Sequence, residues 1–137
     1  MLICQLTDLH LCPPGEAAYR KVETNTLAER AFRAVATLRP AIDALLITGD
    51  LAFDGQDAEY QELMRLLRAH ISCPVYVIPG NHDRRIGMRE QLAGLPGLGA
   101  HPHFIHYAIE DLPIRIVMLD TLVPGAPHGE LCDDRLA

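Results

Sequence analysis

The sequence lacks several features that would place it in a class at once. Its 137 residues contain no run approaching about 18 apolar residues, so no membrane-spanning segment is expected. No basic segment followed by an apolar one opens the chain, and Lys and Arg do not cluster. We therefore expect a cytoplasmic protein that binds neither membranes nor nucleic acid. The net charge is −6, so any site for anionic substrates needs local positive charge, which bound metal would supply.

Paired cysteines are also absent. The four cysteines, Cys4, Cys12, Cys73 and Cys132, form no CxxC motif and no cluster typical of disulfides. Cys4 and Cys73 lie in or beside apolar segments and are interpreted as core residues. Cys12 lies two residues beyond His10, so a role as a soft metal ligand is a weaker alternative. The pattern is typical of a reduced protein.

Apolar residues make up 49% of the chain, which is enough for the packed core of one domain. There is no internal repeat. Apolar runs and helical periodicity alternate along the sequence. The runs predict strands over 2–7, 44–48 and 74–78, helices over 26–38, 57–69 and 84–92, and then two strands over 104–109 and 114–119.

The two longer helices have more detailed signals. Thr26 and Glu29 form a capping-box pattern at the start of the first helix. In the second helix, three leucines recur at a spacing that predicts a buried stripe, and four charged residues at a spacing that predicts an exposed face. The leucines are Leu63, Leu66 and Leu67, and the charged residues are Glu59, Glu62, Arg65 and Arg68.

The order strand–helix–strand–helix–strand indicates an α/β fold, built on a βαβαβ unit and followed by a strand pair. The strands are continuously apolar, which is typical of a parallel sheet covered by helices. In such sheets, ligands bind beyond the carboxyl ends of the strands.

Polar residues follow each of the first three strands. Asp8 and His10 follow the first, Asp50 the second, and 81–83 (Asn-His-Asp) the third. Parallel strands would bring these ends to one edge, where Asp8 and Asp50 would repel each other unless they are protonated or cations bridge them. Two divalent ions about 3.5–4 Å apart clamp both oxygens of a phosphoester displacement and turn bound water into hydroxide near neutral pH. Nitrogen and oxygen ligands suit Mn, Fe or Zn.

His82 has a different predicted role. It follows Asn81, a predicted ligand, and precedes Asp83, which would fix the tautomer of the ring and keep it protonated. A protonated His82 would hold a phosphate oxygen or protonate the leaving alkoxide. Glycines beside Asp50 and Asn81 would let the backbone turn sharply at the strand ends.

At these residues the sequence resembles the metallophosphoesterase (calcineurin-like) superfamily, and most closely its bacterial class III cyclic-nucleotide phosphodiesterase branch. The segments that carry the resemblance are 48–51 (Thr-Gly-Asp-Leu), 79–83, 119–121 (Leu-Asp-Thr), 123–125 (Val-Pro-Gly) and 128–129 (His-Gly). The resemblance implies a four-layer α/β/β/α sandwich, of which this chain is the N-terminal half.

The resemblance also implies roles for individual residues. Asp8 and His10 would bind the first metal ion, Asp50 would bridge both ions, and Asn81 would bind the second ion. His82 would be the catalytic histidine, supported by Asp83. Substrate would contact Asn81, His82 and, beside the mouth of the site, His128.

The sequence departs from the family in one respect. The His-His pair and the Gly-His-x-His motif that supply the remaining ligands are absent from residues 1–137, so the domain is expected to be C-terminally incomplete.

The predicted function is metal-dependent hydrolysis of 3′,5′-cyclic nucleotides or similar small phosphodiesters, with a homodimer as one source of shared ligands. The alternative is a truncated, inactive binding module. His101 and His103 are interpreted as loop residues, and Arg84 and Arg85 either bind phosphate or begin a solvated helix.

Overall fold

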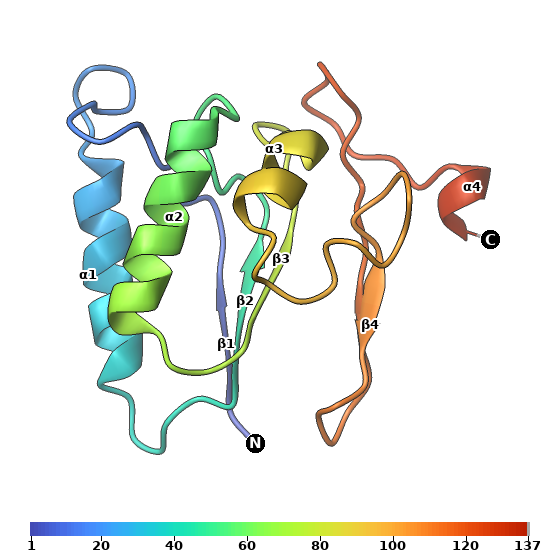
Figure 1. Cartoon of the computed structure of the whole chain (residues 1–137), viewed down its shortest axis with the longest axis horizontal. Helices are drawn as coiled ribbons and strands as arrows, with labels where there is room; N and C mark the ends of the chain where they lie inside the picture. The colour runs from blue at the N-terminus through green and yellow to red at the C-terminus, as the bar shows by residue number, and fades with distance from the viewer. Residues whose placement is uncertain (137) are drawn as a thin grey trace.

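The computed structural model describes residues 1–136 of the chain. Two helices cover one face of a central three-stranded sheet, and an antiparallel strand pair lies on the other side (Figure 1). The elements are β1 (Ile3–Leu6), α1 (Thr24–Ala36), β2 (Ala44–Thr48), α2 (Asp57–His70), β3 (Val75–Ile78), α3 (Arg85–Gln91), β4 (Tyr107–Ile109), β5 (Ile116–Met118) and α4 (Asp133–Leu136). The α/β class and the βαβαβ unit with a following strand pair are confirmed.

The sheet is parallel, in the order β1-β2-β3. In the central strand β2, Leu45 and Ile47 are fully buried in the core beneath the helices, while Ala44 belongs to a second core on the opposite face. Burial on both faces explains why this strand is a continuous apolar run. Because all three strands run in the same direction, the chain leaves each of them at the same edge of the sheet.

Helix α1 differs from its prediction. It begins at Thr24, and Glu23 precedes it without a side-chain cap, so the predicted Thr26–Glu29 capping box is wrong. Leu27 is 52% exposed, whereas Phe32 is fully buried. The buried face is Ala28, Phe32 and Val35, the residues whose spacing of three and four matches the contact with the sheet.

Helix α2 carries the predicted stripe, since Leu63, Leu66 and Leu67 are buried. Its predicted charged face is only half correct, because Glu59 and Glu62 are buried. The Glu59 carboxylate accepts the N–H groups of Asp54 and Gln56, and it closes a capping box at the start of the helix. Glu62 binds Arg65 at 2.7 Å, so the predicted pairing three residues apart is confirmed.

Strands β4 and β5 are three residues each, shorter than predicted. Side chains occupy the backbone groups that a longer ladder would need: the N–H of Ile105 donates to Asp120, and the N–H of Asp120 donates to Nδ1 of His106. Ile109 and Met118 pack on Tyr76 of the sheet in the second core. The pair is therefore held against the sheet on the side away from the helices.

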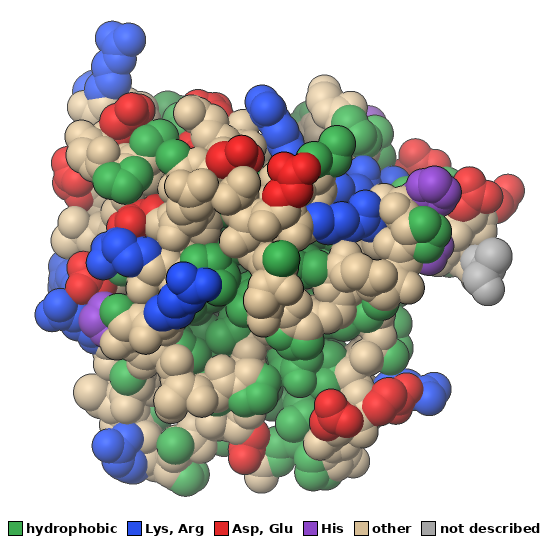
Figure 2. Space-filling model, in the orientation of Figure 1, with side chains coloured by type: hydrophobic (Ala, Val, Ile, Leu, Met, Phe, Trp, Pro, Cys, Tyr) green, Lys and Arg blue, Asp and Glu red, His purple; other side chains and the backbone are tan. Residues whose placement is uncertain are grey.

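Apolar side chains gather between the helices and the strand pair on the face shown in Figure 2. Asp and Glu side chains, with some Lys or Arg, lie around the upper edge, toward which the strands run in Figure 1, and other charged side chains lie at the left and lower edges. Within residues 1–136, no helix is both long enough and apolar enough to span a bilayer.

Candidate active site

The backbone after β1 runs alongside the backbone after β2. The N–H of Asp8 donates to the carbonyl of Gly49 (3.1 Å), and the N–H of His10 donates to the carbonyl of Asp50 (2.9 Å). Asp8, His10 and Asp50 have φ angles of 57°, 44° and 48°. Residues with side chains rarely adopt this left-handed region, and such strain collects at functional sites. Strained backbone thus coincides with three of the predicted metal ligands.

Gly80 lets the end of β3 approach the end of β2. A Cβ atom on Gly80 would overlap both the backbone nitrogen and Oδ1 of Asp50. Glycine is therefore required at position 80 for Asp50 to keep its place. This is close backbone approach, a different use of glycine from the conformational freedom that the sequence suggested.

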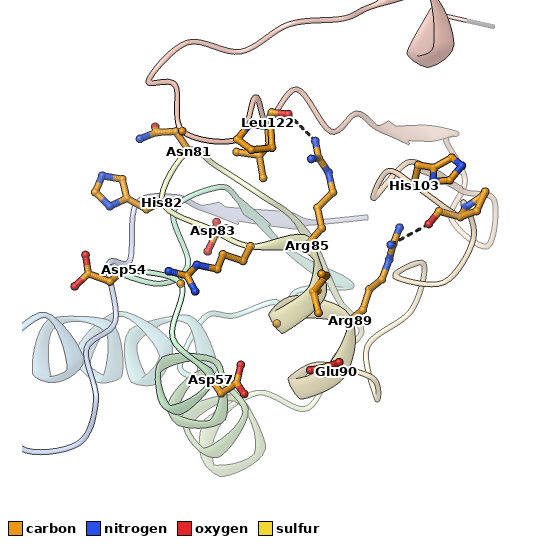
Figure 3. A pocket seen from close by; sticks show the side chains of 17 residues that line it. Asp54, Asp57, Asn81, His82, Asp83, Arg85, Arg89, Glu90, His103 and Leu122 are labelled. Atoms are coloured by element: carbon orange, nitrogen blue, oxygen red, sulfur yellow. Dashed lines mark hydrogen bonds between the residues drawn. The ribbon is translucent and has the colours of Figure 1, made fainter.

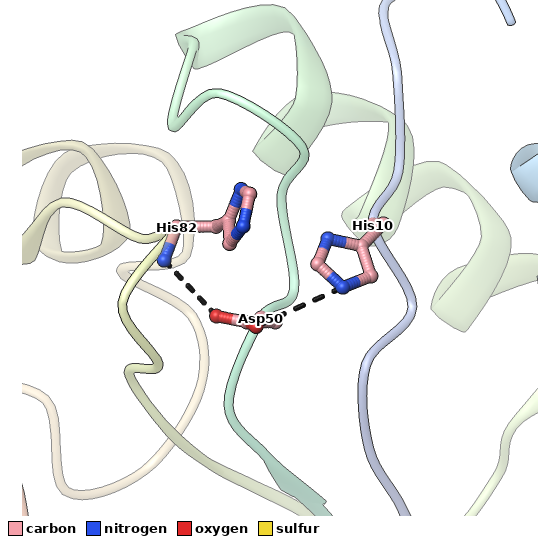
Figure 4. A group of neighbouring side chains, drawn as sticks. All are labelled: His10, Asp50 and His82. Atoms are coloured by element: carbon pink, nitrogen blue, oxygen red, sulfur yellow. Dashed lines mark hydrogen bonds and ion pairs between the residues drawn. The ribbon is translucent and has the colours of Figure 1, made fainter. Parts of the chain in front are cut away.

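The side chains of His10, Asp50 and His82 converge in front of the strand ends (Figure 4). Nε2 of His10 lies 3.7 Å from Oδ2 of Asp50 and 3.7 Å from Oδ1 of Asp8. Oδ1 of Asp50 accepts the N–H of His82 (3.0 Å), and the rings of His10 and His82 meet edge to face, 4.7 Å between centroids. The structure thus brings together four residues that the sequence singled out.

These residues fit a divalent metal ion. One ligand atom each from His10, Asp50 and His82 lies within 4.8 Å of the others. The 3.7 Å separations are too long for good hydrogen bonds. They approach the roughly 3.0–3.6 Å expected between neighbouring ligands whose bonds to one ion are about 2.0–2.2 Å. Nδ1 of His10 is buried without a hydrogen-bond partner among the described residues, so no protein group fixes the tautomer of this ring.

Asp83 does not support His82 in the predicted way. Its buried carboxylate accepts the N–H groups of Leu51, Ala52 and Gly80, at 2.8–3.1 Å, and the hydroxyl of Tyr60 at 3.3 Å. Burial raises the pKa of Asp83 to about 6, although the backbone donors favour the charged form. Asp83 therefore ties together the loops that follow β2 and β3.

The backbone of Phe53 takes the place predicted for Asp83. Nδ1 of His82 lies 2.6 Å from the carbonyl oxygen of Phe53. Since a carbonyl oxygen only accepts hydrogen bonds, Nδ1 carries the proton and Nε2 is the free nitrogen. No residue pattern indicates this contact, because any residue at position 53 would offer the same carbonyl.

A hollow of about 900 Å³ opens beside Asn81 and His82 (Figure 3). It continues along α3 toward His103 and is closed on another side by Leu122 and Pro124. Asn81 is exposed at one end, next to His82, so its predicted role as a metal and substrate ligand stays a prediction. His128 is exposed and, within residues 1–136, is not part of this lining, so its predicted substrate contact also stays a prediction.

Three weaker sequence interpretations can also be compared with the geometry. Burial raises the pKa of the Cys12 thiol, which disfavours the thiolate that a metal needs. Nδ1 of His101 accepts the N–H groups of His103 and Phe104, in agreement with its interpretation as a loop residue. Arg85 is not solvated, because it forms two hydrogen bonds with the fully buried Asp120.

Known proteins are similar to this chain along nearly its whole length. A family profile described as calcineurin-like phosphoesterase matches residues 1–128. A probable glycerophosphodiester phosphodiesterase GpdQ of Arcobacter nitrofigilis is 31% identical over 99% of this chain and 49% of its own length. The 3′,5′-cyclic adenosine monophosphate phosphodiesterase CpdA of Pseudomonas aeruginosa is 32% identical, over 99% of this chain and 47% of its own. A probable cyclic nucleotide phosphodiesterase of Rhodococcus erythropolis is 33% identical, over 98% and 44%. The chain spans about half the length of these relatives.

Proposed function

The chain belongs to the calcineurin-like phosphoesterase family, and from this premise we propose that it hydrolyses phosphodiesters with two divalent metal ions at the candidate active site. The observation that carries the proposal is the convergence of His10, Asp50 and His82 at the ends of parallel strands, with His10 and Asp50 on strained backbone. Convergent N and O ligands on a rigid sheet edge suit metal-assisted hydrolysis.

Each ligand has a proposed role. Asp8 and His10 would hold the first ion and Asn81 the second, and Asp50 would be shared between them. When bound, the ions supply a lowered pKa for water and positive charge for the phosphate oxygens, and Mn, Fe or Zn would suit these ligands. Gly80 and the Asp83 network keep Asp50 and the loop of Asn81 in position.

His82 acts on the substrate in this proposal. Its Nδ1–H is held by the Phe53 carbonyl, so Nε2 faces the substrate, and in the imidazolium form its proton is the one that meets a phosphate oxygen or passes to the leaving alkoxide. The hydrogen bond from the N–H of His82 to Asp50 keeps the ring beside the metal ligands. Fixing both ends of the residue reduces the reorganisation needed when substrate binds.

The proposed substrates are small phosphodiesters, with 3′,5′-cyclic nucleotides first. Relatives of the chain are named as phosphodiesterases for cyclic nucleotides and for glycerophosphodiesters. The hollow beside Asn81 and His82, at about 900 Å³, is large enough for the alcohol portion of either kind. The rates of hydrolysis of a 3′,5′-cyclic nucleotide and of a glycerophosphodiester, measured under the same conditions, decide between the two classes of substrate.

The test is hydrolysis of bis(p-nitrophenyl) phosphate by the Mn²⁺-loaded protein. We expect Asp50→Ala to reduce turnover by about 10³-fold or more, because it removes the shared ligand. Asp111→Ala, an exposed loop residue between β4 and β5, is the matched control and should retain full turnover. Turnover that survives in Asp50→Ala would contradict the proposal.

A catalytically inactive binding module, which holds one metal ion weakly or none, is the second candidate function. Within residues 1–136, the structure contains one cluster of three carboxylate or imidazole ligand atoms, whereas two ions need more ligands. A second copy of the chain in a homodimer is one source of further ligands. Absence of turnover with Mn²⁺ binding weaker than micromolar would favour this candidate, and size-exclusion chromatography with and without Mn²⁺ tests the homodimer.

A further inference from the structure

Three arginines line the hollow beside the candidate active site, and two of them are already engaged. Arg85 donates to both oxygens of Asp120 and to the carbonyl of Leu122, at 2.6–2.8 Å. Arg89 donates to four backbone carbonyls, at 2.9–3.1 Å (Figure 3 shows both side chains). These two guanidinium groups hold loops of the protein in place.

Arg84 is held differently. Its N–H donates to the Tyr60 hydroxyl (2.8 Å), and its Cγ and Cδ atoms pack over Gly55, where a Cβ would lie 2.8 and 3.3 Å from them. The residue is exposed, and its guanidinium has no hydrogen-bond or ion-pair partner within residues 1–136. The start of the side chain is therefore fixed, while its charged end is available.

We propose that Arg84 binds the anionic phosphodiester group of the substrate, next to His82. The inference rests on the proposed function and adds a binding residue to it. Arg84 follows His82 by two positions, and both side chains line the same hollow. A planar guanidinium matches two phosphate oxygens, and its charge is fixed at all working pH values.

The other charged residues of the hollow leave Arg84 as the place where an anion binds. Asp54, Asp57 and Glu90 also line it and repel an anion. Arg85 is paired with Asp120, and Arg89 is bonded to backbone carbonyls. An anionic group that enters beside His82 is therefore attracted by the guanidinium of Arg84. Arg84 thus captures the substrate in its ground state, and the phosphoester chemistry is left to His82 and the ions.

The first experiment compares Arg84→Gln, Arg84→Lys and wild type with bis(p-nitrophenyl) phosphate and Mn²⁺. We expect Arg84→Gln to raise KM about tenfold with kcat within about twofold, because a charge-assisted contact is lost equally from the ground and transition states. Arg84→Lys should recover only part of the affinity, because lysine keeps the charge but lacks the planar guanidinium. Arg30→Gln, on the exposed face of α1, is the control for loss of one positive charge and should leave KM unchanged.

A second readout does not depend on turnover. Dimethyl phosphate, an anion, and trimethyl phosphate, its neutral counterpart, are titrated into each variant and their binding is followed by ligand-observed NMR. Arg84→Gln should weaken binding of dimethyl phosphate and leave trimethyl phosphate unchanged. An unchanged KM, a loss confined to kcat, or equal losses for both probes would overturn the role of Arg84. If no variant turns over substrate, the proposed function fails, and the NMR comparison alone decides the role of Arg84.

Discussion

The two parts of the molecule position their residues in different ways. In residues 1–92, the parallel strands end together, and Asp8, His10 and Asp50 adopt left-handed backbone conformations; one side chain, Asp83, joins the loops that follow β2 and β3. In residues 93–136, strands are short, and side chains bind backbone groups to hold the loops. The candidate metal site is thus positioned mainly by the ends of the strands, whereas the part of the hollow's wall that comes from residues 93–136 is held by individual hydrogen bonds.

Within residues 1–136, the hydrogen bonds that join the two parts involve none of Asp8, His10 and Asp50, so each part can be tested separately. Arg85 on α3 binds Asp120, and the Tyr107 hydroxyl of β4 bonds to the edge strand β3. If the two parts have these separate roles, substitutions in residues 1–92 should affect metal binding. Changes in the second part should affect stability and substrate binding, and leave metal binding intact.

The largest effect is expected from Asp120→Ala. Asp120 is fully buried and bonds to Arg85, to the N–H of Ile105 and to the N–H of Leu122. Removing one partner of a buried ion pair costs about 3–5 kcal/mol of the free energy of unfolding. Urea denaturation measures the loss. Glu110→Ala, which breaks an exposed pair with Arg115, should leave the urea midpoint unchanged.

Gly80→Ala should have the next largest effect, and in the other part of the molecule. Its Cβ would overlap Asp50, so we expect the free energy of unfolding to fall by about 1–3 kcal/mol, as in other overpacked sites. Mn²⁺ affinity, measured by isothermal titration calorimetry, should fall at least tenfold as Asp50 moves. Gly99→Ala is the matched control, because a Cβ there meets no atom within 4 Å. Normal Mn²⁺ binding by Gly80→Ala would show that Asp50 is not positioned by this contact.

Tyr107→Phe tests the contact between β4 and β3. The hydroxyl accepts the N–H of Val77 (2.9 Å) and donates to its carbonyl (2.8 Å). Leaving these backbone groups without partners should cost about 1–3 kcal/mol, seen in thermal denaturation, with Mn²⁺ affinity unchanged. Tyr19→Phe, at an exposed residue, is the control. A drop in Mn²⁺ affinity for Tyr107→Phe would show that residues 93–136 also influence metal binding.

Low pH should destabilise residues 93–136 because Asp120 becomes protonated. Burial alone would raise the pKa of Asp120, but Arg85 and the N–H groups of Ile105 and Leu122 hold it below its ordinary value. A carboxyl with a lowered folded pKa contributes stability above its unfolded pKa of about 3.9, and this stability is lost as the pH falls through the folded pKa. Urea midpoints of wild type should therefore fall more steeply below about pH 4 than those of Asp120→Asn. Parallel curves would contradict this.

Local patterns predicted the first part of the molecule well. Apolar runs placed β1, β2 and β3, and the strand order placed the polar residues that follow them at one edge. These predictions depend on periodicity and chain direction, which the sequence carries directly. Gly80 was recognised as a turn residue, but its contact with Asp50, 30 positions away, depends on the packed sheet.

Local patterns could not predict the side-chain contacts between residues far apart in the sequence. The support of His82 by Phe53 joins a side chain to a backbone carbonyl 29 positions away. The burial of Asp83 and Asp120 likewise follows from loops that meet only in the folded chain. The lengths of β4 and β5 were overestimated because apolar residues continue past the point where Asp120 and His106 take over the backbone groups.

The smallest effect is expected from Thr26→Ala, which tests a misread local pattern. Loss of a side-chain cap costs about 0.5–2 kcal/mol. Thr26 lies inside α1 and is exposed, so its replacement should change the free energy of unfolding by less than about 0.5 kcal/mol. Glu59→Ala is the comparison, since Glu59 closes the capping box of α2 and should show the full cost of a lost cap. Urea denaturation of both variants decides the point: equal losses would mean that Thr26 caps α1 in solution after all.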